Sequence, residues 1–416
     1  MTFMSIEENL IRMTKEERAA YFNENFFKDL KATIKTVADG SPFYKKLCEK
    51  AGYDFEQELD LSKLAAVPYL LTKHYKENQG IFPQLTRVPE NRIKYRTIST
   101  ATSGNPSIVA RTELDIKFLQ TMSVDAYKDF LYWNDCTHLF NFVPSRFMLN
   151  MVAKRTTTQP KAASFVYFFN QPWERHCNTT YMIQYPFFRN LWNQFRHLFR
   201  VESVFELKTK KMAETIKNRK EDDFIVIGGN TILIYNVAEK IFREKGITFD
   251  LGDHGAVGTG GGGWDGIKGS IKGQPMTKQD MIDKIKEVYG IPAENVGDIY
   301  SFTESSALFG GHYSKKYKDQ ILHTLPFVKI IVRNPETGEP VKPGETGTLE
   351  VITPYGINGF SSVAIMVDDF VQLLGDNDSA CPECGYKGAY FIHRGRQNPP
   401  LGTSCSSILD FFERMH

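Results

Sequence analysis

The N-terminal part of the chain carries a helical pattern of apolar and polar positions. Between residues 5 and 38, apolar residues recur largely at helical spacing among charged residues, and the Gly-Ser-Pro sequence at 40–42 ends the pattern. A stretch with strand-like spacing follows over 92–98 and leads into a run of small and hydroxyl-bearing residues over 99–107. Apolar segments rich in Phe, Tyr and Trp then alternate over 118–199. These patterns predict a helical N-terminal region followed by mixed helices and strands.

Three short apolar runs further along the chain each predict a buried strand. The run over 224–227 precedes a glycine pair and then a helical pattern, which is the strand–turn–helix unit of an α/β sheet. A second predicted strand over 247–251 precedes the glycine run 258–263. A third predicted strand, over 296–300, follows a predicted helix over 278–289. An α/β body is therefore expected in this part of the chain.

The pattern changes from Leu325 onward to short alternating strands separated by turn signals, which is typical of a mostly antiparallel β region. We therefore divide the chain into an α/β body over 1–325, a β-rich region over 326–395 and a short C-terminal segment over 396–416. The predicted fold class is α/β, with one large body that includes a smaller β region.

Composition narrows the range of functions. The chain has 416 residues, with 51 Lys and Arg against 49 Asp and Glu, and this balance gives no support for a nucleic-acid-binding tail. No window approaches the roughly 18 consecutive apolar residues of a membrane span, and the N-terminus lacks a secretory signal pattern. The six cysteines are too sparse for a disulfide scaffold, so a cytoplasmic protein is expected. Aromatic residues make up 13% of the chain, which suggests that rings line a binding surface as well as the core.

A candidate phosphate-binding loop lies at 99–106, with the sequence Ser-Thr-Ala-Thr-Ser-Gly-Asn-Pro. Hydroxyls and unobstructed backbone N–H groups can both donate hydrogen bonds to the oxygens of a polyphosphate. Clusters of Ser, Thr, Gly and Pro are more often plain loops, so this run alone does not decide between the two interpretations.

Three further segments carry residues suited to a nucleotide. The glycine run 258–263 ends at Trp264, which makes a plain linker a poor explanation. The segment 298–304 places an aromatic residue and a carboxylate at the end of a predicted strand, where open α/β sheets bind ligands. A Gly-Asp pair at 375–376 and a Gly-Arg pair at 395–396 follow. Each segment alone is better explained as a structural loop, but their order along the chain is informative.

In that order, the segments resemble the motifs of the adenylate-forming superfamily, and most closely its phenylacetate-CoA ligase and acyl-protein synthetase branch. The run 99–106 resembles the superfamily's phosphate loop, with Ala101 in place of a glycine. The segment 300–304 resembles its Tyr-Gly-x-Thr-Glu motif, with Ser301 in place of the glycine. The Gly-Asp and Gly-Arg pairs also match. The resemblance covers nearly the whole chain and implies the large N-terminal domain of the adenylate-forming fold.

This resemblance implies that ATP and Mg²⁺ take part in the conversion of a carboxylic acid to an acyl-adenylate. It assigns Glu304 to Mg²⁺ and Tyr300 to a stack beside adenine. Asp376 would accept hydrogen bonds from the ribose hydroxyls, and Arg396 would fix the ribose or a phosphate. The other residues that it assigns to the nucleotide are Ser99, Thr100, Thr102, Ser103, Gly104, Gly261, Gly262 and Thr303. Part of the aromatic segment 118–199 lies where the superfamily builds its acyl pocket and is expected to form a wall of it.

The C-terminal end departs from the superfamily pattern. Full-length members carry a separate C-terminal domain with a lysine that assists the first half-reaction, whereas the twenty residues after Arg396 contain no lysine. Cys405 in this segment resembles the acyl-accepting cysteine of the acyl-protein synthetase family of the bacterial bioluminescence fatty acid reductase. The resemblance implies that a fatty acid is activated, that Cys405 takes it as a thioester, and that a partner reductase or carrier protein receives it.

Two other functions stay open on the sequence. In a CoA ligase of the phenylacetate type, CoA would be the thiol acceptor and Cys405 would be incidental. In a binding protein that kept the fold without catalysis, the departures at Ala101 and Ser301 would be explained. The self-acylating acid–thiol ligase is the function that we predict.

Cys381 and Cys384 form a Cys-Pro-Glu-Cys-Gly sequence, which has the shape of a zinc knuckle. The sequence contains no second Cys-x-x-Cys pair, so the other ligands of a structural zinc would have to be histidines. The candidates are His254, His312, His323 and His393. His393 is better explained as a packed strand residue. A structural zinc and a metal-free tight turn are both open interpretations.

Overall fold

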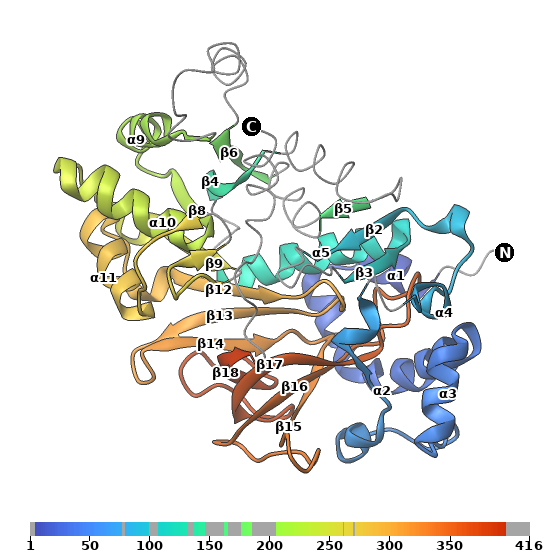
Figure 1. Ribbon diagram of the computed structural model, residues 1–416. Coiled ribbons are helices and arrows are strands. Elements are labelled where there is room, and N and C mark those ends of the chain that lie inside the picture. The colour runs from blue at the N-terminus through green and yellow to red at the C-terminus, as the bar shows by residue number, and fades with distance from the viewer. Residues whose placement is uncertain are drawn as a thin grey trace, which may run out of the picture.

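The computed structural model describes residues 5–76, 80–99, 107–131, 136–145, 162–164, 176–184, 205–260, 262–268 and 271–396. Thirteen strands of this part of the chain form one sheet (Figure 1). Twelve of them follow one path, and their order is β15 (Lys329–Arg333), β16 (Thr346–Ile352), β17 (Ala364–Gly375), β18 (Tyr390–Arg396), β14 (Asp319–Thr324), β13 (Leu308–Ser314), β12 (Val296–Ser301), β9 (Gly255–Gly260), β8 (Phe224–Asn230), β4 (Cys136–Pro144), β6 (Asn178–Gln184) and β7 (Glu206–Leu207). The short β1 (Leu70–Leu71) pairs with β17.

Two smaller sheets accompany the large one. The first has the order β3 (Ile108–Arg111), β2 (Tyr95–Ile98) and β5 (Ala162–Ser164). The second is the antiparallel pair of β10 (Ile267–Lys268) and β11 (Ile271–Lys272). The register of β2 and β3 pairs Ile98 with Ile108, so the strands that flank the candidate phosphate loop lie side by side.

The large sheet changes from parallel to antiparallel strand pairing at β12 and β13. The strands β6, β4, β8, β9 and β12 pair in parallel. From β13 through β14, β18, β17 and β16 to β15 every pairing is antiparallel, which confirms the antiparallel region predicted after Leu325. Because β15–β18 continue the same sheet, the boundaries at 325 and 396 stay our proposal for how to divide the chain.

Helices cover both faces of the parallel part of the sheet. Successive residues of a strand point to opposite faces. On β8, Ile225 and Ile227 pack in a cluster with residues of α9 (Thr209–Lys217), α10 (Thr231–Asn236) and α11 (Lys278–Tyr289). Val226 of the same strand packs with Tyr127 of α5 (Glu113–Phe130). The layers are therefore helix, sheet and helix, which confirms the predicted α/β class.

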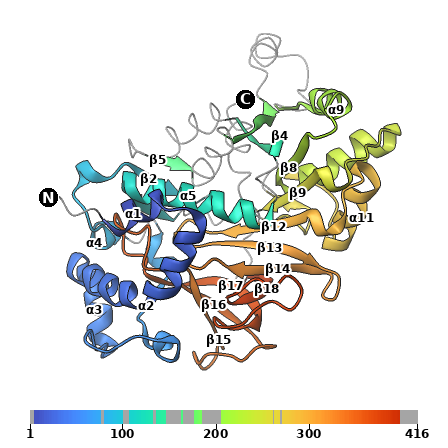
Figure 2. The same ribbon diagram turned by 180° about the vertical axis from the view of Figure 1, so that it is seen from behind.

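The N-terminal helices differ from the prediction of one continuous pattern. The structure has α1 (Ile6–Arg12), α2 (Lys15–Gly40) and α3 (Pro42–Lys50), followed later by the short α4 (Phe82–Leu85). The break falls at Thr14, whose side chain accepts a hydrogen bond from the Glu17 N–H at 3.2 Å while Glu17 accepts one from the Thr14 N–H at 2.7 Å. This capping box starts a new helix inside the helical pattern. Figure 2 shows α1, α2 and α3 at one end of the molecule and α9 and α11 at the other.

Most strands and helices predicted for the α/β body are confirmed, and one is wrong. The strand predicted at 224–227 is β8, the helix predicted at 278–289 is α11, and the strand predicted at 296–300 is β12. The segment 247–251 is not a strand, because its N–H groups bond to the end of α11, with Leu251 donating to the Tyr289 carbonyl at 2.9 Å. The strand of this region is the glycine-rich β9. None of the described helices is long and apolar enough to cross a membrane.

Candidate functional site

Glu304 lies in the loop that follows β12 and is 5% exposed. The hydroxyl of Ser107, just before β3, donates a hydrogen bond to Oε1 of Glu304. Ser107 also donates from its N–H to Oγ of Ser99 at 2.7 Å, and the Ser99 N–H donates to the Ser107 carbonyl at 2.9 Å. The two residues that flank the candidate phosphate loop therefore meet beside Glu304. Within that loop, the predicted nucleotide ligands outside the described residues are Thr100, Thr102, Ser103 and Gly104.

Arg111, at the end of β3, holds the loop that carries Glu304. Its guanidinium is 1% exposed and donates to the carbonyls of Thr303 at 3.1 Å and Ser305 at 3.0 Å, and to the Gly356 carbonyl at 3.0 Å. Burial lowers the pKa of Arg111 from its usual value. The predicted residue Thr303 is buried and is held through its backbone. Arg111 therefore fixes the loop backbone on both sides of Glu304.

Tyr300 lies near the end of β12 among other rings. Its ring centroid is 5.6 Å from those of Phe309 and His393 and 5.8 Å from that of Phe302. The side chain is partly exposed while its hydroxyl is buried. Burial raises the pKa of Tyr300 well above its ordinary value, and the charge of Asp369 adds to the effect. A partly exposed ring with a fixed orientation is suited to stack on a planar base.

Asp369 on β17 contacts two side chains of β18. Its Oδ1 is 2.8 Å from Nε2 of His393 and accepts a hydrogen bond from Nε of Arg396 at 3.1 Å. Burial alone would raise the pKa of Asp369, but the hydrogen bond to His393 and the charge of Arg396 bring it below its ordinary value. The pKa of Arg396 is raised, chiefly by Asp369, with smaller contributions from Tyr300 and Glu304. Tyr300, Asp369 and Arg396 are therefore joined through direct contacts with one another or with His393.

Asp376, the predicted ribose ligand, lies apart from this group. It is exposed, and its Oδ1 accepts a hydrogen bond from the Ser379 hydroxyl at 2.5 Å, which lowers its pKa. The register of β17 with β18 pairs Asp369 with Arg396, whereas Gly375 pairs with Tyr390 at the other end. Six residues of extended strand span roughly 20 Å. The carboxylate that the structure brings to Tyr300 and Arg396 is thus Asp369.

The glycine run begins beside Tyr300. Strands β9 and β12 run in parallel, with Gly260 opposite Ile299, so their carboxyl ends share one edge of the sheet. The Thr259 hydroxyl donates to Oδ1 of Asp298 at 3.1 Å and ties the two strands together. Gly262 is exposed with a φ of +75°, and Gly261 lies outside the described residues. This edge is where ligands bind in open α/β sheets.

The Cys-x-x-Cys pair meets two histidines in the fold. One ligand atom from each of His312, His323, Cys381 and Cys384 lies within 4.8 Å of the other three. His254 and His393 take no part in this group. His254 is exposed, and His393 packs on β18 as predicted.

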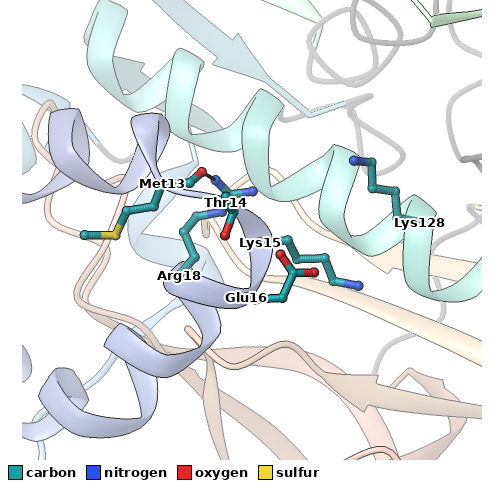
Figure 3. Close-up of a pocket in the computed structure, with 6 residues that line it drawn as sticks. All are labelled: Met13, Thr14, Lys15, Glu16, Arg18 and Lys128. Atoms are coloured by element: carbon teal, nitrogen blue, oxygen red, sulfur yellow. Dashed lines mark hydrogen bonds between the residues drawn. The ribbon is translucent and has the colours of Figure 1, made fainter.

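A polar depression of about 370 Å³ lies where α1 meets α2, next to α5 (Figure 3). Its lining residues are Met13, Thr14, Lys15, Glu16, Arg18 and Lys128. Arg18 donates to Oδ2 and Oδ1 of Asp125 at 2.8 and 2.7 Å, and Lys15 pairs with Asp129. Because carboxylates of α5 already engage these two cations, the depression is better explained as a junction between helices than as a ligand site.

Two predictions lie largely outside the described residues. Cys405 is one of them. The aromatic wall predicted within 118–199 is the other, because 146–161, 165–175 and 185–204 are not described. Phe118 is a core residue whose ring packs edge to face on Phe327 at 5.5 Å.

The sequence analysis did not single out three residues of the candidate site. Ser107 stood at the end of the hydroxyl-rich run and carried no signal of its own. Arg111 closes the apolar run 108–110, and a cation at the end of an apolar strand is a usable signal. Asp369 follows Asp368 within a mostly apolar strand, which is a signal of the same kind.

Comparison with known proteins identifies a family and a fold. The family described as acyl-protein synthetase, LuxE, matches residues 196–410. An open conformation of 2-hydroxyisobutyryl-CoA ligase in complex with 2-HIB-AMP and CoA is similar in structure, with a TM-score of 0.58 at 14% identity over 92% of this chain and 71% of that chain. The same ligase in the postadenylation state with R3-HIB-AMP gives a TM-score of 0.58 at 15% identity over 95% of this chain and 72% of that chain. No curated protein matches the chain.

The structural likeness shows the fold alone, because the identity is low. The family match covers just over half of the 416 residues and includes the loop of Glu304 and both strands that carry Asp369 and Arg396. The chain therefore belongs to the LuxE acyl-protein synthetase family of acid–thiol ligases and has the adenylate-forming fold.

Proposed function

We propose that this protein activates a fatty acid with ATP to an acyl-adenylate and then takes the acyl group onto its own Cys405. The observation that carries the adenylation step is the arrangement at the end of β12. There the ring of Tyr300 lies beside His393, which contacts Asp369, and the loop that follows places Glu304 against Ser107. The family match supports the acyl transfer to protein.

The triphosphate would bind at the loop of residues 99–106. Its hydroxyls and N–H groups would donate to the β- and γ-phosphates. Mg²⁺ prefers oxygen ligands, and the buried carboxylate of Glu304 with the adjoining Ser107 hydroxyl offers that donor set. When bound there, the ion would neutralise negative charge on the phosphates. Arg111 would keep the Glu304 loop in place while the nucleotide binds.

The nucleoside would bind across Tyr300 and Asp369. The partly exposed ring of Tyr300 would stack on adenine. Contacts with His393 and Arg396 lower the pKa of Asp369, and its carboxylate would accept hydrogen bonds from the ribose hydroxyls, the role that the sequence assigned to Asp376. Arg396 uses Nε for Asp369, so its terminal nitrogens would be the donors for ribose or phosphate.

The chemistry follows from this placement. A carboxylate oxygen of the acid attacks the α-phosphorus of ATP, and pyrophosphate leaves with the electrons of the broken P–O bond. The site contributes by positioning the acid and the nucleotide for this attack and by neutralising negative charge on the phosphates. The thiolate of Cys405 then attacks the acyl carbonyl, AMP leaves, and a thioester results. A reductase or carrier protein would receive the acyl group.

Incubation of the full chain with MgATP and a radiolabelled long-chain fatty acid, without CoA, tests this function. We expect label on the protein that hydroxylamine removes, that Cys405→Ala abolishes, and that the matched control Cys177→Ala keeps. Full labelling of Cys405→Ala would overturn the transfer step. Product formed only when CoA is added would identify a CoA ligase instead. Absence of acid-dependent pyrophosphate exchange with every acid tested would overturn adenylation as well.

A further inference from the structure

Four side chains that are distant in sequence converge on one face of β13 and β14. His312 lies on β13 and His323 on β14, while Cys381 and Cys384 lie in the loop between β17 and β18. Sγ of Cys381 is 3.7 Å from Nε2 of His312, and Sγ of Cys384 is 3.6 Å from Nε2 of His323. All four ligand atoms lie within 4.8 Å of one another.

The two sulfur–nitrogen separations match those of a tetrahedral zinc site. Bonds of about 2.3 Å from zinc to sulfur and about 2.0–2.1 Å to nitrogen, at a tetrahedral angle, place the two donors roughly 3.5 Å apart. The two observed sulfur–nitrogen distances are close to that value. A set of two sulfurs and two nitrogens in this geometry selects zinc among the common metals.

The loop that carries the cysteines is folded as a knuckle. The Cys381 N–H donates to the Tyr386 carbonyl at 2.9 Å, and the Gly385 N–H donates to the Cys381 carbonyl at 2.8 Å. Gly385 has a φ of +74°, a left-handed conformation that glycine adopts without strain. Glu383, between the cysteines, accepts a hydrogen bond from the Ser314 hydroxyl at 2.7 Å, which ties the knuckle to the end of β13.

Contacts with neighbouring groups orient both histidines. Nδ1 of His312 lies 3.3 Å from the carbonyl oxygen of Tyr313, which favours the tautomer that leaves Nε2 as a lone-pair donor toward Cys381. His323 is fully buried, and its ring stacks on Phe130 of α5 at 5.5 Å. On β13, a Cβ at Gly310 would overlap the Phe130 ring, so the glycine allows this close packing.

The cluster lies on the opposite face of the sheet from the base-stacking ring. Residues directly opposite each other on paired strands share a face. His323 pairs with Gly310, which faces α5, whereas the neighbouring residue Phe309 pairs with Tyr300. The cluster therefore faces α5 and does not contact the nucleotide site.

We propose that His312, His323, Cys381 and Cys384 bind one structural Zn²⁺, which joins β13 and β14 to the loop between β17 and β18. Strands β14 and β18 share only two register pairs, Leu322 with Phe391 and His323 with Tyr390. The ion would add a link between these neighbouring parts of the sheet. Its ligands come from segments 61 and 69 residues apart, so it would cross-link the antiparallel region.

Metal content of the full chain tests this site without any activity measurement. The protein is purified from cells grown with added zinc, passed over a weak chelating resin, and analysed by plasma mass spectrometry. We expect about one zinc per chain in the wild type and in His254→Ala, a control that removes an exposed histidine outside the cluster. We expect loss of at least about nine-tenths of it in Cys381→Ser/Cys384→Ser.

Cobalt substitution of the wild type keeps the test valid if the double variant does not fold. We expect the visible bands of tetrahedral Co²⁺ and a near-ultraviolet charge-transfer band from thiolate ligands. The proposal is overturned if the wild type holds no zinc after incubation with excess Zn²⁺, or if Co²⁺ gives an octahedral spectrum. A Cys381–Cys384 disulfide found by peptide mass analysis of the freshly purified protein would overturn it too.

Discussion

The hydroxyl of Ser107 donates a hydrogen bond to Oε1 of Glu304 across 197 positions of the chain. Ser107 directly follows the candidate phosphate loop, and Glu304 follows the strand that carries Tyr300. The contact therefore joins the two segments that would hold the triphosphate and its cation. Arg111 lies four residues after Ser107 and fixes the backbone on either side of Glu304. These contacts therefore attach the paired strands β2 and β3 to the loop that follows β12.

Removal of the charge at Glu304 is expected to stop adenylation. Glu304→Gln keeps an oxygen that can accept the Ser107 hydrogen bond but cannot neutralise a cation, so acid-dependent pyrophosphate exchange should fall by at least about 100-fold. The exchange assay with a long-chain fatty acid measures this directly. Glu221→Gln, at an exposed turn, should stay within about twofold of the wild type. Exchange of Glu304→Gln within about threefold of wild type would contradict the metal assignment.

The ribose assignment can be tested with two matched substitutions. Asp369→Asn should raise the KM for ATP about tenfold or more, because a buried charged acceptor loses its charge. Asp376→Asn should leave the KM for ATP within about twofold, because that carboxylate is exposed and bonds to Ser379. Pyrophosphate exchange at varied ATP measures both. If Asp376→Asn has the larger effect, Asp376 is the ribose ligand and our reassignment is wrong.

Arg111 is expected to act by holding the Glu304 loop. Arg111→Lys keeps a cation but cannot reach all three carbonyls, so the free energy of unfolding should fall by about 2–3 kcal/mol in urea titrations. The KM for MgATP should rise as well, because the loop loses its orientation. Arg92→Lys, at an exposed position, is the control. Loss of stability with an unchanged KM would show that Arg111 supports the core and does not position the site.

The local pattern of apolar and polar residues was sufficient to predict some of the helices and strands. The helix at 278–289 and the strand at 296–300 have apolar residues at the right spacing and clear ends, and both form as predicted. The strand predicted at 247–251 failed because its hydrogen bonds go to the C-terminus of α11. The strand β9 was read as a loop because of its glycines. Gly258 allows a close approach there, since a Cβ would lie 2.7 Å from a methyl carbon of Leu131.

The sequence could assign candidate residues where one short segment carries them. Tyr300 and Glu304 lie four residues apart in one motif, so both could be named as candidates from the sequence. Asp369 was missed because its pairing with Arg396 depends on the register of β17 with β18, which the sequence does not display. The histidine partners of Cys381 and Cys384 could be named only as candidates, since the contacts span 69 and 61 residues.

The pairing of Asp369 also predicts a pH dependence of stability. Despite its burial, His393 and Arg396 hold the pKa of Asp369 below its ordinary value of 3.8, so near that pH the native state binds fewer protons than the unfolded state. The stabilisation by Asp369 is therefore complete above the ordinary pKa and is lost as the pH falls through the lowered native pKa. Asp369→Asn does not titrate, so it should be less stable than wild type at pH 7 by about 1–3 kcal/mol. Urea unfolding between pH 7 and pH 3 should show this difference shrinking below about pH 4, and a difference that stays constant would mean that Asp369 is not held ionised by its neighbours.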